Sequence, residues 1–200
     1  MLAGTEIARR IMRNLDCEVL TSSKDGQLVS AGQTFFTVRG AAADLHAAWK
    51  VCLNVFGHLS AVATETRSMV DAVHAVNPEC EVLTTRKSMP GAKDLLTCAV
   101  MAGGAFPHRL GLSETVLVFE QHLAFFGGFN RFVEEMPRIK TRCVEKKLFV
   151  EADAKRAIAL ARACAGGHGV DGIQPDKVPV SELGELVRRI RDICPRITII

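Results

Sequence analysis

Several residue types and patterns are scarce or absent in this chain of 200 residues. It contains no Tyr and a single Trp, so aromatic platforms for stacking nucleic-acid bases are poorly supplied. No apolar run approaches the ~20 residues that are needed to span a bilayer. The net charge of +3 is small, and no run of Lys and Arg is interleaved with aromatic residues. These absences argue against a nucleic-acid-binding protein and against a membrane protein.

Cysteine is present, but without the spacing of a metal site or of a disulfide framework. No two cysteines form a C-x-x-C pair, and their number is odd; they lie at positions 17, 52, 80, 98, 143, 164 and 194. We therefore expect reduced, structural thiols in a cytoplasmic protein. The first residues lack the pattern of a signal peptide, because Glu6 and three arginines interrupt any apolar segment.

The first 76 residues predict a small α+β region followed by a long helical region. A helix is predicted from Thr5, which would be its N-cap, and strands are predicted at 17–20 and 34–39. Apolar residues then keep helical spacing from 41 to 76, with a break predicted near Gly57. Asn77-Pro78 ends this helical pattern.

From residue 81 onward, strand and helix patterns alternate. Strands are predicted at 81–85, 115–119, 148–152, 170–174 and 197–200. Helices are predicted between them at 92–102, 122–137, 154–165 and 181–193, with Ser181 as the cap of the last. Five strands with four crossovers indicate a parallel sheet with right-handed connections. Periodicity alone does not distinguish an open sheet from a closed barrel.

Cations gather in two loops of this alternating region. Arg86 and Lys87 precede a Pro-Gly turn, Lys93 follows that turn, and His108 and Arg109 follow a second loop that contains two glycines and a proline. Cations at the ends of buried parallel strands are costly unless an anion lies there. An Arg fork suits a carboxylate or a phosphate, and Lys supplies a point charge. The cluster is therefore either a set of solvated loop charges or a site for a polyanion.

Four segments carry a resemblance to a known family, and two of them, at 84–91 and 103–122, are long and unusual in composition. They read LNVFGHLSAVATETRSMVDAV at 53–73, TTRKSMPG at 84–91, GGAFPHRLGLSETVLVFEQH at 103–122 and GIQPDK at 172–177. These segments resemble the quinolinate phosphoribosyltransferase (nicotinate-nucleotide pyrophosphorylase) family, and most of all its ModD branch, which is associated with molybdenum transport. The resemblance covers essentially the whole chain.

The resemblance implies an α/β fold in two domains. Residues 1–76 would be the remnant of an N-terminal α/β sandwich domain with a helical junction. Residues 77–200 would form an incomplete parallel β/α barrel with five of about six strands. Measured against the family, the chain is expected to be shortened at both ends.

The resemblance also implies an activity. The family joins quinolinate to phosphoribosyl pyrophosphate, forms nicotinate mononucleotide, and releases pyrophosphate and carbon dioxide. The chain would thus be a pentosyltransferase that binds anionic small molecules, uses Mg²⁺ with phosphoribosyl pyrophosphate, and works as a homodimer with shared active sites. The alternatives are an accessory protein of molybdenum metabolism that binds another anion in the same cleft, and an inactive fragment.

Carried over by position, the two basic pairs would be the substrate-binding residues. Arg86 would bind one quinolinate carboxylate, Lys87 would lie near the pyridine ring or the sugar, and His108 and Arg109 would bind the second carboxylate. Lys50 takes the place of a family arginine that reaches into the partner's site; it could equally be a surface lysine of a helix.

Two acids follow strand patterns, where parallel folds place their sites. Glu151 and Asp176 would face the ribose and the Mg²⁺ ion, and together with Lys87 they are the implied catalytic residues. A helix-leading acid or a turn residue explains each of them equally well when it is taken alone. The chain departs from the family at Phe119, which stands where the family has a lysine, and this favours either a different substrate or an activity that has drifted.

Overall fold

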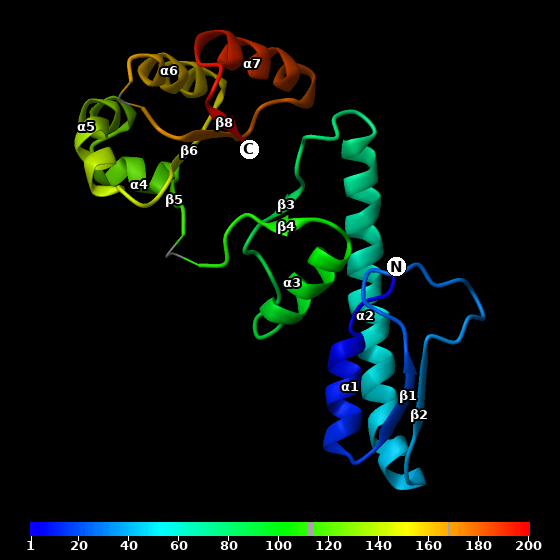
Figure 1. Cartoon of the computed structure of the whole chain (residues 1–200). Helices are drawn as coiled ribbons and strands as arrows, with labels where there is room; N and C mark the ends of the chain where they lie inside the picture. Colours follow the sequence, from blue (N-terminus) through cyan, green and yellow to red (C-terminus); the bar gives the residue numbers. More distant parts are fainter. Residues whose placement is uncertain (112–113, 168) are drawn as a thin grey trace. The chain divides into compact units, whose positions relative to one another are not determined.

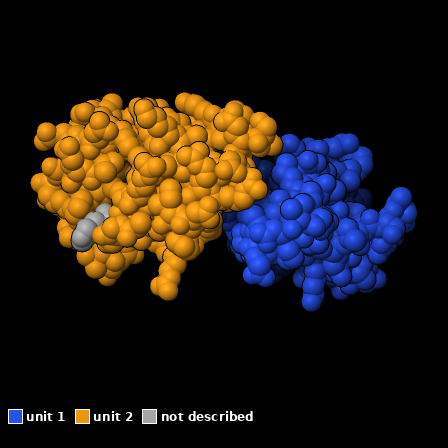
Figure 2. All heavy atoms as spheres, turned by 90° about the horizontal axis from the view of Figure 1, so that it is seen from above, with its two compact units in different colours: residues 1–110 blue, residues 111–200 orange. Residues whose placement is uncertain are grey.

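The structure is a computed structural model that describes residues 1–111, 114–167 and 169–200. It divides into two compact units, residues 1–110 and 111–200, which Figure 2 distinguishes by colour. Leu112 and Ser113, which belong to the motif at 103–122, lie outside the described residues. Each unit is described separately below.

Unit 1 contains three helices and two small sheets. Its elements are α1 (Thr5–Asn14), β1 (Glu18–Ser22), β2 (Phe36–Arg39), α2 (Ala42–His74), β3 (Leu83–Thr84), α3 (Lys93–Ala102) and β4 (Phe106–Pro107). Strands β1 and β2 pair in an antiparallel manner, whereas β3 and β4 are parallel. The long helix α2 is central to unit 1, because both α1 and α3 pack against it (Figure 1).

A buried stripe along α2 connects the packing of unit 1. Near its start, Ala48, Cys52 and Phe56 pack with apolar residues of α1 and of the β1–β2 hairpin. Further along, Leu59 and Ala63 pack with Ala99 of α3. The end of α3 approaches α2 so closely that a Cβ at Gly103 would lie 2.6 Å from the Ala63 carbonyl oxygen. This close approach fixes the direction in which the chain enters β4.

Unit 2 is a four-stranded parallel sheet with helices between the strands. Its elements are β5 (Val116–Val118), α4 (Glu120–Phe125), α5 (Phe129–Arg142), β6 (Leu148–Ala152), α6 (Ala154–Ala165), β7 (Gly172–Pro175), α7 (Val180–Ile193) and β8 (Thr198–Ile199). The strand order is β5-β6-β7-β8. The core joins the sheet to the helices α4, α5, α6 and α7, and its members include Val150, Ile173, Phe132, Leu160 and Ile190.

Side chains alternate between the two faces of a strand, so every second residue of β5, β6 and β7 points to the face opposite this core. Leu117 pairs with Phe149, and Phe149 pairs with Gly172. The Phe149 ring lies over the Cα of Gly172, because a Cβ at that glycine would be 2.1 Å from Phe149 Cε1. On the same face of the sheet, the next pair toward the carboxyl ends is Glu151 with Gln174.

The α/β fold and most predicted elements are confirmed, but three helix details are wrong. Gly4, with φ +97°, is the N-cap of α1, and Thr5 is its first residue. Gly57 does not break α2, which runs unbroken past it because buried residues on either side hold it against α1 and α3. Pro179 precedes α7, so that Ser181 lies inside the helix and does not cap it.

Two features between residues 100 and 140 differ from the sequence analysis. The predicted helix 122–137 is two helices, α4 and α5, separated by Gly127 and Gly128 with φ of +86° and +106°. The strand β4 was not predicted, because a two-residue strand carries no periodicity. The boundary of the compact units after Leu110 also differs from the predicted boundary after residue 76, since α3 packs on α2. The predicted sandwich and barrel domains stay a prediction.

Within the described ranges, none of the helices is both long enough and apolar enough to cross a membrane.

We predict that Gly172→Ala destabilises the chain by about 1–3 kcal/mol, because the added methyl displaces the buried Phe149 ring. Gly184→Ala is the matched control. It adds the same methyl in the middle of α7, where nothing lies within 4 Å, and should stabilise the chain by roughly 0.5–1 kcal/mol. Urea unfolding followed by circular dichroism measures both. Equal effects of the two substitutions would contradict the packing described here.

Candidate functional site

A cavity of about 280 Å³ in unit 1 collects the cations of the two basic loops. Four of its lining residues are cationic: Arg86, Lys87, Lys93 and Arg109. The remaining lining residues are four hydroxyl-bearing side chains and five apolar ones, among them Val62, Leu96 and Val100. No Asp or Glu is found among the described residues that line the cavity. Its lining therefore combines the charge that suits an anion with several apolar side chains.

The strands β3 and β4 explain how the two loops meet. Thr84 and Pro107 are partners in the parallel pair, so the residues that follow both strands leave the same edge. The His108 N–H donates to the Thr84 carbonyl oxygen at 3.1 Å, which extends the pairing by one step. Two loops that lie more than 20 residues apart in the sequence thus meet where β3 pairs with β4.

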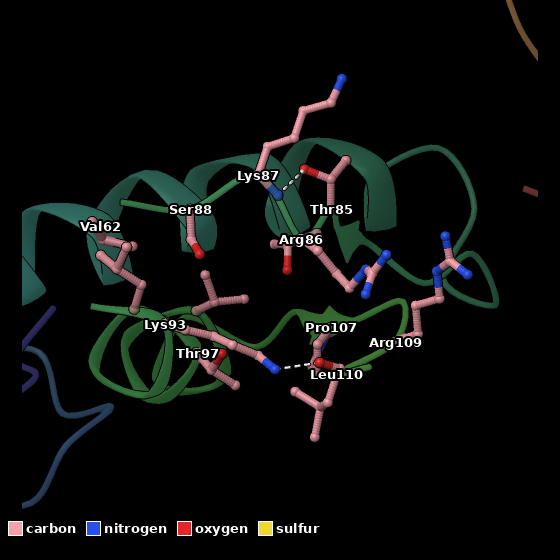
Figure 3. A pocket seen from close by; sticks show the side chains of 13 residues that line it. Val62, Thr85, Arg86, Lys87, Ser88, Lys93, Thr97, Pro107, Arg109 and Leu110 are labelled. Atoms are coloured by element: carbon pink, nitrogen blue, oxygen red, sulfur yellow. Dashed lines mark hydrogen bonds between the residues drawn. The ribbon is translucent and has the colours of Figure 1, made fainter. Parts of the chain in front are cut away.

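The predicted binding residues differ in how they face the cavity. In Figure 3 the Arg86 and Arg109 guanidinium groups lie toward the same end of the cavity, while the Lys87 side chain points away from the other residues. Arg109 is buried, whereas Arg86 and Lys87 are exposed. The Lys87 N–H donates to Thr85 Oγ1 at 3.2 Å, which orders the turn. His108 is half-buried and is not one of the lining residues.

Lys50 lies apart from this cavity. It is exposed on α2, and its Nζ lies 4.5 Å from the centroid of the Trp49 ring, a cation–π contact within one helix face. This contact agrees with a surface lysine. The role in a partner's site that the resemblance implies stays a prediction.

Glu151 and Asp176 lie on neighbouring strands of unit 2, at their carboxyl ends. Gln174 Nε2 donates to Glu151 Oε2 at 3.4 Å, across the pairing of β6 with β7. Asp176 follows Gln174 by two residues, so the alternation of an extended chain places all three side chains on one face. The Asp176 N–H donates to the Ala152 carbonyl oxygen at 3.0 Å, which holds the end of β7.

The structure removes one alternative for Glu151. Asp153 is the N-cap of α6 and accepts a hydrogen bond from the Arg156 N–H at 2.9 Å. Glu151 lies two residues earlier, inside β6, so it is not the helix-leading acid. Asp176 likewise precedes α7 by several residues. Arg86 and Arg109 belong to unit 1 and the two acids to unit 2, so the convergence of all these residues on one cleft stays a prediction.

The acids fit a magnesium ion that arrives with a phosphorylated substrate. Mg²⁺ is commonly held by one or two carboxylates together with substrate phosphates. Glu151 supplies a carboxylate from β6, and Asp176 supplies one from the residue directly after β7, the neighbouring strand. In the parts of the chain that the structure describes, no three His, Cys, Asp or Glu residues gather to form a metal site on their own.

An aromatic pair that sequence reasoning missed lies beside Glu151. Phe119 follows β5 directly, and the pairing of Val118 with Val150 places it next to Glu151 in the neighbouring strand. Its ring stacks on His122 at a centroid distance of 5.5 Å. The Phe119 N–H donates to His122 Nδ1 at 3.0 Å, which fixes the imidazole over the start of α4. The i, i+3 spacing of the two aromatics could have indicated this contact.

In each unit, parallel strands carry charged residues at or after their carboxyl ends, which is the place where α/β proteins bind their ligands. Comparison with known families makes this specific. The chain belongs to the quinolinate phosphoribosyltransferase family, since the N-terminal domain model of this family matches residues 1–60 and the C-terminal domain model matches residues 62–200. The family is one of pentosyltransferases.

Individual relatives support the same assignment and its ModD branch. The chain is 37% identical over 187 residues to ModD of Rhodobacter capsulatus, which is named as a pyrophosphorylase of unproven activity; the match covers 93% of the chain and 70% of the relative. It is 32% identical over 158 residues to a nicotinate-nucleotide pyrophosphorylase (carboxylating) of Mycobacterium leprae, covering 77% of the chain and 54% of that protein.

Solved structures show the same fold. The nicotinate-nucleotide pyrophosphorylase of Francisella tularensis superimposes with a TM-score of 0.82 at 26% identity, covering 99% of the chain and 67% of that structure. NadC of Streptococcus pyogenes gives a TM-score of 0.81 at 25% identity, covering 96% of the chain and 66% of that structure. The chain thus spans about two thirds of the length of these structures.

We predict that Arg86→Ala and Arg109→Ala each weaken the binding of inorganic pyrophosphate roughly tenfold or more, because each removes a charge-assisted hydrogen-bond donor from an acid-free cavity. Arg189→Ala, which removes the same charge from the exposed surface of α7, is the control and should leave affinity unchanged. Isothermal titration at low ionic strength measures the three dissociation constants. An equal loss in the control would mean that only net charge matters.

Proposed function

We propose that the chain takes part in a phosphoribosyl transfer of the quinolinate type, in which quinolinate and phosphoribosyl pyrophosphate give nicotinate mononucleotide, pyrophosphate and carbon dioxide. The observation that carries this proposal is the cavity whose described lining residues include four cations and no acid. Both substrates carry several negative charges, so a site without competing carboxylates suits them. Its apolar side chains suit a planar ring.

In this proposal the cationic residues bind the acid substrate, and the acidic residues bind the ribose and the metal ion. Arg86 and Arg109 bind the carboxylates of the acid substrate, with His108 and Lys87 beside them. Glu151 accepts hydrogen bonds from ribose hydroxyls, a role for which Gln174 orients it. Asp176 and Glu151 would hold the magnesium ion, whose charge would offset that of the pyrophosphate leaving group. Positive charge develops at the sugar carbon during displacement, so positioned carboxylates contribute by electrostatic stabilisation.

We further propose a homodimer that forms through α2, in the cytoplasm. Large apolar side chains of this helix are half exposed, with fractions of 49% for Trp49, 51% for Leu53 and 53% for Met69. Single exposed apolar residues are ordinary, but Trp49 and Leu53 lie one turn apart on one face of α2, which suits an interface; Met69 lies on another face. Lys50 stands among them, which is the position from which a side chain could reach a partner's site.

Calorimetric titration with phosphoribosyl pyrophosphate and Mg²⁺, with and without quinolinate, tests the proposed function. Binding that depends on Mg²⁺, together with formation of nicotinate mononucleotide, is the expected result. Glu151→Gln should keep the chain folded and lower turnover by roughly a hundredfold or more, because it removes the charge that stabilises the sugar carbon. A folded chain that binds neither substrate would refute the proposal for this chain.

The alternative function, binding of another anion in molybdenum metabolism, is favoured by Phe119. An uncharged ring stacked on His122 stands beside Glu151 where the resemblance leads one to expect a lysine. One cation fewer means weaker recognition of a second acidic group. Binding of molybdate without release of pyrophosphate would support this alternative.

We predict that Phe119→Lys raises the affinity for quinolinate about fivefold to tenfold, since an ammonium group adds a charge-assisted contact. Phe119→Leu, which removes the ring and adds no charge, is the control and should not improve binding. Titration with quinolinate in the presence of Mg²⁺ measures both variants. Unchanged affinity in the lysine variant would show that residue 119 does not face the acid substrate.

A further inference from the structure

Lys93 makes a contact that no assigned role explains. It is the first residue of α3, and its Nζ donates a hydrogen bond to the Leu110 carbonyl oxygen, 17 residues further along the chain. Figure 3 shows its side chain reaching across the cavity to that oxygen. Leu110 is the last residue of unit 1. The contact therefore joins the start of α3 to the end of the loop that carries Arg109.

The backbone on both sides of Arg109 is held. On its amino-terminal side, the His108 N–H donates to the Thr84 carbonyl oxygen at 3.1 Å. On its carboxyl-terminal side, the Leu110 carbonyl oxygen accepts from Lys93. Both anchors, Thr84 and Lys93, come from elements that line the cavity. Arg109 itself is buried and lines the same cavity.

Local stability does not account for a lysine at this position. A cation in the first turn of a helix is unfavourable because the helix N-terminus is itself the positive end of the dipole. Lys93 also shares its cavity with three other cations, and like charges repel. An ammonium group bound to one carbonyl still presents two further donors. A residue that lowers the stability of its own helix in this way typically serves a functional site.

We propose that Lys93 is a positioning residue. It fixes the Leu110 carbonyl and thereby holds Arg109 in the cavity, ready to bind an anionic group. The tether itself follows from the contacts above, whereas its effect on ligand binding rests on the proposed function. Direct binding of the anion by Lys93 is the competing explanation.

The tether is tested first without any ligand, by limited trypsin digestion followed by mass spectrometry. Cleavage after Arg109 requires local release of this loop. Lys93→Met, which keeps the length and removes the donor, should speed that cleavage about fivefold or more, since a charge-assisted hydrogen bond is lost. Lys93→Arg keeps a cationic donor and should restore the slow rate. Lys87→Met, a matched loss of one lysine from the same cavity, should leave it unchanged.

General unfolding is separated from local release by normalising to cleavage after Arg189 in α7. Lys93→Leu, which also lacks a donor, serves if the Met variant does not fold. Unchanged cleavage after Arg109 in Lys93→Met or Lys93→Leu would overturn the tether.

The second measurement asks how Lys93 acts, with inorganic pyrophosphate as the probe. Lys93→Met should weaken binding about fivefold in the wild-type background and hardly at all in the Arg109→Ala background, because coupled residues give non-additive effects. Rescue by Lys93→Arg is expected only in the presence of Arg109. Additive losses would overturn positioning in favour of direct binding. If the wild-type chain binds no pyrophosphate or other anion, the proposed function fails, while the digestion still decides the tether.

Discussion

The buried stripe of α2 is the constraint on which the rest of unit 1 depends. Small residues along it, such as Ala48 and Ala63, allow α1 and α3 to approach closely, and Gly103 has no room for even one methyl group. Because α3 ends against α2, the chain turns into β4 at a fixed place and pairs with β3. Two residues on each strand are too few to be stable alone. Helix packing thus brings the two basic loops together. The short pairing of β3 with β4 follows from that packing and does not cause it.

Much of the fold could be predicted, and the misses share a cause. Long periodic segments, such as the helices 154–165 and 181–193 and the strand 148–152, follow from the sequence because many residues repeat one signal. Gly57 was misjudged since its low helix propensity, about 1 kcal/mol below that of alanine, is outweighed by buried neighbours in a 33-residue helix. Conversely, the adjacent Gly127 and Gly128 do end a helix, because their positive φ angles are incompatible with helix.

The candidate site could be predicted in composition but only partly in geometry. The pairs Arg86-Lys87 and His108-Arg109 stand out because charges next to rigid turns are easily read from the sequence. Which groups these side chains contact depends on the strand register and on the direction of each side chain. Lys93 finds the carbonyl of Leu110 only because α3 folds back beside β4, and no local pattern encodes such a contact. The sequence also could not show that Lys87 points away while its neighbour Arg86 does not.

The distribution of charge suggests which part of the chain decides substrate choice. Unit 1 contributes cations and no carboxylate to its cavity, whereas the strand ends of unit 2 contribute Glu151 and Asp176. A lysine at position 119 would stand next to Glu151 across the ladder and would neutralise part of its charge. Phe119 brings no such charge to this place in the ladder, which agrees with the hydroxyl donors and the divalent ion proposed as partners of Glu151. In the proposed function, recognition of the acidic groups of quinolinate then rests on Arg86 and Arg109 of the unit 1 cavity, and position 119 is where a gain or loss of one cation would change that recognition.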